Sequence, residues 1–433
     1  MAEMSDRVVI VGGGVIGLCS AYYALRAGLP VTVVERDEHR EANCSVGNAG
    51  MVVPSHFVPL AAPGMIAKGL RWMFSRESPF YVRPRPSPEL IRWGWIFHRC
   101  STQRHVEASR DLLRDLNLES RRLFHELAED GDFGLVDRGL LMLCDTQKGL
   151  EEEAELAGQA AEIGIEAEVV DAAGAAALDP AVAMEIAGAV HYRQDCHLHP
   201  ARLMALLRRR VVEMGGRIEY GCPIDELLFS GGRLAAVAGG GRRHEGGRFV
   251  FAGGSWTGLL LKKLGLRLPL QPGKGYSLTL GNPPELPGLC SIFSEAKVAV
   301  TPMGGGLRFA GTMEVGGLNL KIDPARVHGI IKSVPRYFPA FSESDFEGIA
   351  PWAGLRPVSP DGIPYLGRVE GLDNLVVATG HAMMGLSLGP VSGRLVADLL
   401  VGAEPFRPIE KLAVGRFGDR VRKRPSASDR PAG

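Results

Sequence analysis

Three glycines and one glutamate near the start of the chain have the types and the spacing of a dinucleotide-binding site. Gly12, Gly14 and Gly17 form the pattern G-x-G-x-x-G. The first glycine permits a tight turn, the second lets the backbone approach a pyrophosphate, and the third lets a helix pack closely on a strand. Glu35 follows at the spacing at which a carboxylate accepts hydrogen bonds from both hydroxyls of an adenosine ribose. Because this carboxylate would repel a 2′-phosphate, the pattern disfavours NADP.

A strand, a helix and a second strand have to hold these residues in place. Residues 8–11 read as an apolar strand, the glycine turn opens a helix, and residues 31–34 read as a strand that ends at Glu35. The unpaired N–H groups and the dipole of the helix start favour a negatively charged pyrophosphate there. The sequence therefore predicts that a dinucleotide contacts Val11, Gly12, Gly13, Gly14, Val15, Ile16, Gly17, Glu35 and Arg36.

Two other interpretations of this stretch are weaker. A glycine-rich turn without a ligand would not need the strand, the third glycine and the acid in these positions. Residues 8–25 carry no charge and are long enough to be taken for a membrane span, but their glycines and tyrosines argue against one. We therefore expect a dinucleotide-binding unit.

The composition is that of an ordinary globular enzyme. Hydrophobic residues make up 45% and charged residues 23% of the 433 residues, and 49 basic side chains balance 49 acidic ones. A net charge of zero gives no electrostatic reason to expect nucleic acid as a partner. The seven cysteines are scattered without a C-x-x-C pair, which is typical of reduced thiols and predicts neither a disulfide framework nor a metal site. With no signal pattern in the first residues, we expect a cytoplasmic protein.

Later segments are predicted to reach the same ligand. Residues 43–55 have no helical or strand period, so we expect a loop that passes along the dinucleotide. A strand entering at Ile224 would lie against the adenine, and the buried strand 249–252 ends in glycines that allow close approach. Residues 374–379 form another apolar strand, which precedes a helix from about 386 to 400 as residues 8–11 precede the first helix. The residues predicted in these segments are Ser45, Asn48, Ala49, Gly50, Ile224, Ala252, Gly253, Trp256, Gly380, Gly385 and Leu386.

The rest of the chain suggests a second structural unit. Residues 274–280, 298–301 and 307–312 alternate as antiparallel strands do. Residues 56–100 mix prolines with tryptophans and arginines, which fits either a helical excursion packed on the enzyme or a peripheral contact of residues 57–100 with the inner face of a membrane. Residues 411–433 are rich in arginine, proline and serine, which predicts a disordered tail.

Several stretches of the chain match the motifs of a known family. They are VVIVGGGVIGLCSAYYALRAG, NCSVGNAG, FAGGSW, LGLRLPLQPGKGYSLTL, WAGLRPVSPDGIPYLG and VVATGHAMMGLSLGP. In these stretches the chain resembles the FAD-dependent D-amino acid dehydrogenases, which belong to the D-amino acid oxidase and glycine oxidase superfamily. The resemblance runs from about residue 7 to 402, and two departures, HLHP at 197–200 and HAMMG at 381–385, bear on the shape of the pocket.

The resemblance implies an α/β protein with an α+β substrate part. A Rossmann-like FAD-binding domain is expected beside a discontinuous second domain built on a mainly antiparallel sheet. We assign residues 1–55, 190–255 and 350–410 to the FAD-binding domain, residues 56–189 and 256–349 to the substrate or cap domain, and residues 411–433 to the tail.

The implied reaction is the oxidative deamination of a D-amino acid, in which a hydride passes from the α-carbon to FAD and the imino acid then hydrolyses to the 2-oxo acid. Cyclic substrates such as D-proline or hydroxy-D-proline fit this family. A glycine- or sarcosine-type amine oxidase, a flavin-binding subunit of a larger dehydrogenase and an NAD-dependent oxidoreductase are the alternatives. The sequence leaves the electron acceptor open among a quinone, a dye-like carrier and O₂.

Three residues are candidates for work on the substrate. The resemblance places Arg356 at the substrate carboxylate, which a planar guanidinium fork can orient. It places Tyr276 on the substrate side of the flavin. His381 is either a proton acceptor or a contact at the flavin edge, because it stands at a helix start beside glycines. We expect no metal, since flavin chemistry needs none.

Overall fold

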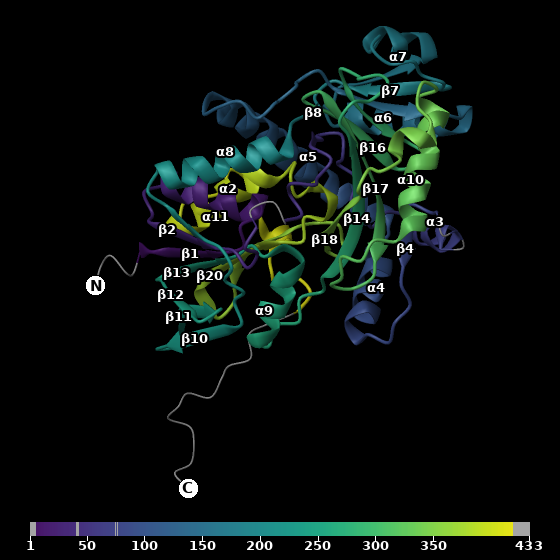
Figure 1. Cartoon of the computed structure of the whole chain (residues 1–433). Helices are drawn as coiled ribbons and strands as arrows, with labels where there is room; N and C mark the ends of the chain where they lie inside the picture. Colours follow the sequence, from purple (N-terminus) through teal and green to yellow (C-terminus); the bar gives the residue numbers. More distant parts are fainter. Residues whose placement is uncertain (1–5, 40–42, 74, 76, 419–433) are drawn as a thin grey trace.

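The computed structural model describes residues 6–39, 43–73, 75 and 77–418, and its elements form two large sheets and two smaller ones with helices around them (Figure 1). One sheet has six strands in the order β19-β20-β13-β1-β2-β9. All neighbours in it are parallel except β19 and β20. Its strands are β1 (Val8–Val11), β2 (Val31–Val34), β9 (Arg217–Glu219), β13 (Arg248–Phe251), β19 (Tyr365–Val369) and β20 (Leu372–Thr379).

Successive side chains of β1 point to opposite faces of this sheet, and both faces are buried. Val8 and Ile10 pack under helices on one face, whereas Val9 and Val11 belong to the core on the other face. The helices of the first face are α2 (Val15–Arg26), α5 (Gln103–Glu129), α8 (Pro200–Glu213) and α11 (Gly389–Val401). The opposite face carries α9 (Thr257–Lys263) and a three-stranded antiparallel sheet of β10 (Glu226–Ser230), β11 (Arg233–Gly239) and β12 (Arg242–Glu245).

The second sheet has nine strands and is mainly antiparallel. Its order is β18-β14-β17-β16-β15-β5-β7-β6, and β4 pairs with β17. The β15–β5 and β17–β4 pairs are its parallel neighbours. The strands are β4 (Phe80–Val82), β5 (Leu140–Cys144), β6 (Ala167–Asp171), β7 (Gly188–Tyr192), β14 (Gln271–Leu280), β15 (Cys290–Phe293), β16 (Val298–Met303), β17 (Gly306–Val315) and β18 (Trp352–Val358).

The two faces of this second sheet have different neighbours. The outer face packs against α10 (Pro324–Tyr337) and α7 (Ala172–Leu178). The inner face packs partly against α6 (Gln147–Glu162). One row of cross-strand partners on the inner face consists of Ser277, Ala310, Ala299, Ile292 and Met142. Small side chains in the middle of this row leave room above the sheet.

The remaining elements connect the two sheets. They include the helices α3 (Met65–Trp72) and α4 (Pro88–Cys100) and the short pair β3 (Met51–Val52) and β8 (Cys196–His197). Residues 57–100 thus contain the expected short helices, and Ile91 and Trp95 of α4 are 69% and 57% exposed. Contact of this segment with a membrane stays a prediction. Within the described part of the chain, no helix combines the length and apolarity that crossing a bilayer requires.

Several expectations need correction. The strand β18 pairs with β14 and β7 pairs with β5, so residues 352–358 and 190–192 lie in the second sheet, not with the dinucleotide-binding strands. The helix α11 begins at Gly389, three residues later than expected, because a 3-10 turn at Ala382–Met384 comes first. Residues 411–418 are ordered, since Leu412 is buried and Arg416 pairs with Asp361. Residues 419–433 lie outside the described residues.

Candidate functional site

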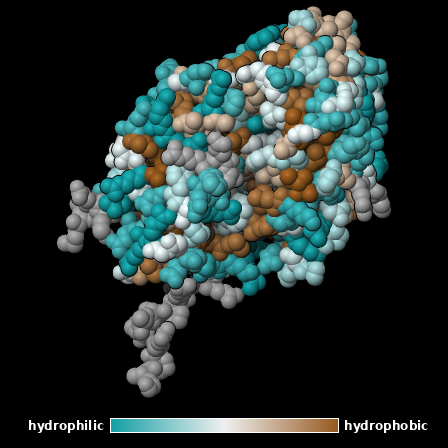
Figure 2. All heavy atoms as spheres, viewed as in Figure 1, coloured by the Kyte–Doolittle hydropathy of each residue, from teal (hydrophilic) through white to brown (hydrophobic). Residues whose placement is uncertain are grey.

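A cavity of about 1420 Å³ lies between the two sheets. It is larger than the 300 to 1,000 Å³ of an ordinary small-molecule pocket, so it has room for a dinucleotide and a second molecule. Leu259, Leu320 and Met383 line it and are also exposed at the surface. Figure 2 shows that apolar residues gather in a band over the strands of the second sheet and toward α9.

Most of the predicted site residues line this one cavity. Of the residues predicted at the cofactor, those on its wall are Val11, Gly12, Gly14, Val15, Ile16, Glu35, Arg36, Ser45, Asn48, Ala49, Ile224, Ala252, Gly253, Trp256, Gly385 and Leu386. Tyr276, Arg356 and His381 border it as well. Gly13, Gly17, Gly50 and Gly380 do not line it; they shape the backbone around it.

The glycine turn has the geometry that the spacing predicts. Gly12 has a φ of +116°, and a Cβ there would meet the carbonyl of Ala252 at the end of β13. A Cβ on Gly17 would overlap the carbonyl oxygen of Gly12, so only glycine lets α2 pack this closely on the turn. Gly14 has no close neighbour except Ser45, which leaves its backbone open to the cavity. This cradle fits a pyrophosphate.

Glu35 is oriented by the backbone around it. Its Oε2 accepts a hydrogen bond from the Gly13 N–H at 2.5 Å, and its Oε1 accepts one from the Asp37 N–H at 3.0 Å. A carboxylate has about four acceptor positions, so acceptors remain for two ribose hydroxyls. Beside it the Arg36 guanidinium lies 3.6 Å from the centre of the Trp256 ring, which closes this end of the cavity with a cation–π contact.

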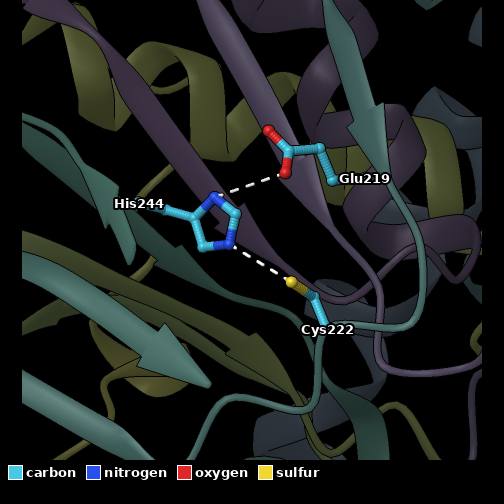
Figure 3. A group of neighbouring side chains, drawn as sticks. All are labelled: Glu219, Cys222 and His244. Carbon is cyan, nitrogen blue, oxygen red and sulfur yellow. Dashed lines mark hydrogen bonds and ion pairs between the residues drawn. The ribbon is translucent and has the colours of Figure 1, made fainter. Parts of the chain in front are cut away.

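A chain of three side chains braces the strand ends next to Glu35 (Figure 3). Cys222 Sγ lies 3.3 Å from His244 Nε2, and Glu219 Oε2 lies 3.8 Å from His244 Nδ1. Sulfur and carboxylate therefore face different ring nitrogens of His244. The Cys222 N–H also donates to the Glu35 carbonyl at 2.9 Å, so this chain supports the ribose end of the site.

The loop of residues 43–50 is held by the second sheet. The Arg308 guanidinium donates to the carbonyls of Val46 and Asn48 at 3.0 and 2.7 Å. Ser277 Oγ donates to the carbonyl of Gly47 at 3.1 Å. Burial lowers the pKa of Arg308 to about 10. The sequence motifs did not predict a role for Arg308 or Ser277, whose signal was only their position in alternating strands.

Ser45 links this loop to the glycine turn. Its Oγ accepts a hydrogen bond from the N–H of Val15, the first residue of α2, at 3.0 Å. The side chain therefore occupies one of the donors that the helix start offers. Asn48 has an internal role, because its Oδ1 accepts from the Gly50 N–H at 2.8 Å.

Backbone strain is concentrated at the cavity. The non-glycine residues with positive φ in the described ranges are Lys297, Thr312 and Ala382, with φ of 55°, 68° and 48°. All of them line the cavity. Such conformations cost about 1 to 3 kcal/mol each and cluster at functional sites. This observation identifies the functional region independently of any motif.

Arg356 carries a positive charge that no described acid neutralises. It is partly buried, and its Nη1 donates to the carbonyl of Thr312 at 2.7 Å. Gly275 on the neighbouring strand makes space for it, because a Cβ there would overlap the guanidinium. Burial lowers the pKa of Arg356, since a charge removed from water is costly. No ion pair joins it to an acidic residue within the described ranges, so an anionic ligand would complete this part of the site.

His381 is buried in the cavity wall. Its Nε2 lies 2.9 Å from Ser392 Oγ, whereas its buried Nδ1 has no hydrogen-bond partner. Burial lowers the pKa of His381 to about 3, so the imidazole is neutral in the folded protein. The neutral ring can accept or donate one hydrogen bond toward a bound molecule through Nδ1.

The buried imidazole makes folding stability depend on pH. The folded pKa lies below the ordinary value of 6.5, so this contribution is present above pH 6.5 and is lost as the pH falls toward 3. At pH 5 the loss amounts to about 2 kcal/mol. We expect urea unfolding of His381→Gln to lose about that much less than the wild type between pH 8 and pH 5. The exposed residue His98 provides the control variant His98→Gln. An unchanged pH dependence in His381→Gln would contradict the assignment.

Tyr276 does not present its hydroxyl to the cavity. The ring is 1% exposed and belongs to the outer core of the second sheet with residues of α10. Its hydroxyl donates to Glu314 at 2.8 Å, and Lys274 lies 3.4 Å from the same carboxylate. Alternation along β14 therefore directs Ser277 and Gly275 inward and Tyr276 outward. Tyr276 borders the cavity while its hydroxyl is bound to Glu314, and its catalytic role stays a prediction.

Trp352 also lines the cavity, although the sequence motifs did not predict it as a site residue. It begins β18, and its ring fills the space where Gly47 and Gly354 have no side chain. The ring thus separates the cofactor loop from the strand that carries Arg356. Its place at the start of the motif WAGLRPVSPDG was the signal that could have identified it.

The chain is similar to known proteins over almost its whole length. A family model described as FAD dependent oxidoreductase matches residues 7–399. The D-amino acid dehydrogenase of Methylobacterium nodulans is 35% identical over 432 residues, which cover 95% of this chain and 99% of the relative. The D-amino acid dehydrogenase of Rhizorhabdus wittichii is 34% identical over 433 residues, which cover 95% of this chain and 100% of the relative.

Solved structures share the whole fold. The glycine oxidase from Geobacillus kaustophilus superposes with a TM-score of 0.74 at 23% identity, over 95% of this chain and 99% of that chain. The L-proline dehydrogenase from P. horikoshii superposes with a TM-score of 0.70 at 16% identity, over 95% and 98%. The predicted combination of a Rossmann-like domain and a mainly antiparallel second sheet is confirmed. The chain belongs to the DAO family of FAD-dependent oxidoreductases, and it is an enzyme with FAD as its cofactor.

Proposed function

We propose that this enzyme oxidises a D-amino acid to the imino acid, which then hydrolyses to the 2-oxo acid. The observation that carries the proposal is the Arg356 guanidinium, a cation in the cavity without an acidic partner among the described residues. A substrate carboxylate supplies the missing charge. The names of the curated relatives support the D-configuration.

The residues of the cavity fit FAD. Gly12, Gly14 and the start of α2 would hold the pyrophosphate, and Glu35 would hold the adenosine ribose. The loop 43–50, clamped by Arg308 and Ser277, would lie along the cofactor. When bound, FAD supplies the acceptor for the hydride that leaves the α-carbon.

The side chains of the protein would orient the substrate and balance the charge of its carboxylate. Arg356 would bind the substrate carboxylate through two parallel donors, which fixes the direction of the α-hydrogen. Neutral His381 does not compete with Arg356 for the carboxylate, because it carries no charge at neutral pH. The apolar wall excludes water from the site and strengthens the contact between Arg356 and its anion.

Anaerobic absorption spectroscopy tests the proposed function. We expect the purified protein to be yellow with FAD and to lose its flavin colour when a D-amino acid is added. The panel should contain D-alanine, D-methionine, D-proline, hydroxy-D-proline and D-glutamate, their L-enantiomers, glycine and sarcosine. Bleaching by L-enantiomers alone, or by none of these compounds, would overturn the proposal, and bleaching by glycine or sarcosine alone would favour an amine oxidase.

A further inference from the structure

A second cationic group borders the cavity close to Arg356. The strands β15 and β16 are joined by a turn at residues 294–297, and Lys297 ends it with a φ of 55°. Ala299 pairs with Ala310 in the antiparallel register of β16 and β17. Beyond this pair the two strands stay side by side, because a Cβ on Gly311 would lie 3.4 Å from Val298 Cγ2, and Lys297 and Thr312 are the next residues along them. Thr312 is the residue whose carbonyl accepts the hydrogen bond from Arg356.

Lys297, Thr312 and Arg356 line the same cavity. Neighbouring strands are about 5 Å apart, and Lys297 and Thr312 each lie two residues beyond the pair formed by Ala299 and Ala310. A lysine side chain adds about 6 Å of flexible reach. Arg356 and Lys297 can therefore contact the two ends of one amino acid.

The ammonium of Lys297 has unused donors. The side chain is 40% exposed and lines the cavity, and its ion pair with Glu153 is long, at 3.9 Å. Among the described residues, the contact with Glu153 is the shortest polar contact of the Lys297 Nζ. Burial lowers the pKa of Lys297, the charge of Glu153 opposes this shift, and the charge of Lys68 adds to it. An ammonium has three donors, so at least two remain for a ligand.

The nearby acids accept hydrogen bonds from other side chains of the protein. Glu153 Oε1 accepts from Ser294 Oγ at 2.6 Å. Glu295 accepts from the Tyr337 hydroxyl at 2.7 Å and from the Thr146 hydroxyl at 2.9 Å. His56 is neutral, because burial and the charge of Lys297 lower its pKa to about 4. Glu153 and Glu295 are therefore held by hydrogen bonds within the protein, whereas the side chain of Lys297 lines the cavity.

We propose that Lys297 binds a second anionic group on the substrate, and that the preferred substrates are acidic D-amino acids such as D-glutamate or D-aspartate. This inference rests on the proposed function. The left-handed backbone conformation of Lys297 is costly for lysine, whereas glycine would adopt it without strain. Such a cost is expected where the side chain itself has a function. Arg356 then holds the α-carboxylate and Lys297 the side-chain carboxylate.

Paired substrates that differ only in charge test the inference. We expect kcat/KM for anaerobic flavin reduction to be higher with D-glutamate than with D-glutamine in the wild type. Lys297→Met should lower kcat/KM for D-glutamate about 10- to 100-fold and leave D-glutamine and D-alanine within about twofold. An equal loss on all of these substrates, or no preference for D-glutamate in the wild type, would overturn it.

Three further variants separate charge from structure. Lys297→Arg should keep the preference for D-glutamate because it keeps the charge. Lys297→Gly relieves the strained backbone, so it should lose the preference without a lower melting temperature. Lys332→Met removes an exposed lysine that pairs with Glu77 away from the cavity, and it should behave as the wild type. Loss of the preference in Lys297→Arg or its retention in Lys297→Gly would contradict the role of this ammonium.

Binding of unreactive acids gives a readout that does not depend on turnover. Glutarate should perturb the flavin spectrum at concentrations about 10-fold lower than butyrate in the wild type, and equally to butyrate in Lys297→Met. Equal binding of both acids to the wild type would refute the second anionic subsite. Reduction by D-alanine but not by D-glutamate would refute this inference alone, whereas no reduction by any D-amino acid would refute the proposed function.

Discussion

Arg356→Lys is expected to lower kcat/KM for flavin reduction by a D-amino acid about 30- to 5,000-fold. This corresponds to a loss of about 2 to 5 kcal/mol for a charge contact in a desolvated site. The lysine would keep the charge, but an ammonium cannot replace the two parallel donors of a guanidinium. It would also lose the fit over Gly275, whose missing side chain makes space for the guanidinium. The substrate would then bind with its α-hydrogen less well directed, so we expect a lower reduction rate and not only weaker binding.

Rapid-mixing measurements of the bound flavin separate these effects. The limiting rate at saturating D-amino acid reports orientation, and the concentration dependence reports affinity. Arg122→Lys, on the exposed face of α5, is the matched control and should leave both unchanged. If Arg356→Lys reduced its flavin at the wild-type rate and with wild-type affinity, Arg356 would have no part in substrate binding.

Glu35→Ala should weaken FAD binding at least about 100-fold. Two charge-assisted hydrogen bonds to the ribose contribute about 1.5 to 3 kcal/mol each, so their joint loss is about 3 to 6 kcal/mol. The structure adds a second reason. The carboxylate also accepts from the N–H groups of Gly13 and Asp37, so its removal leaves the buried Gly13 N–H without a partner and loosens the glycine turn.

Titration of the apoprotein with FAD measures this loss. Glu35→Gln keeps an acceptor for Gly13 but removes the charge, so we expect an intermediate dissociation constant. Glu38→Ala, at an exposed position in the same segment, should bind FAD as the wild type does. Circular dichroism of each apoprotein distinguishes weaker binding from unfolding. Undiminished FAD affinity in Glu35→Ala would remove Glu35 from the site.

The sequence by itself predicted the elements whose contacts join residues close together in the chain. Residues 8–36 form the predicted strand, turn, helix and strand because their spacing encodes a unit whose parts are neighbours along the chain. The antiparallel strands β14, β16 and β17 follow from alternation in the same way. The link between these motifs and an FAD-dependent family is confirmed by the comparisons.

The tertiary structure decided which side chains share the cavity. Alternation divides Tyr276 and Ser277 between two faces of β14, but only the packing of α10 shows that the face of Tyr276 is the outer one. The clamp of Arg308 on the loop 43–50 joins residues far apart in the chain, as does the cavity that both Lys297 and Arg356 line. Such contacts depend on strand order and register across two sheets. These are properties of the whole fold, because each strand could satisfy its own pattern in several pairings.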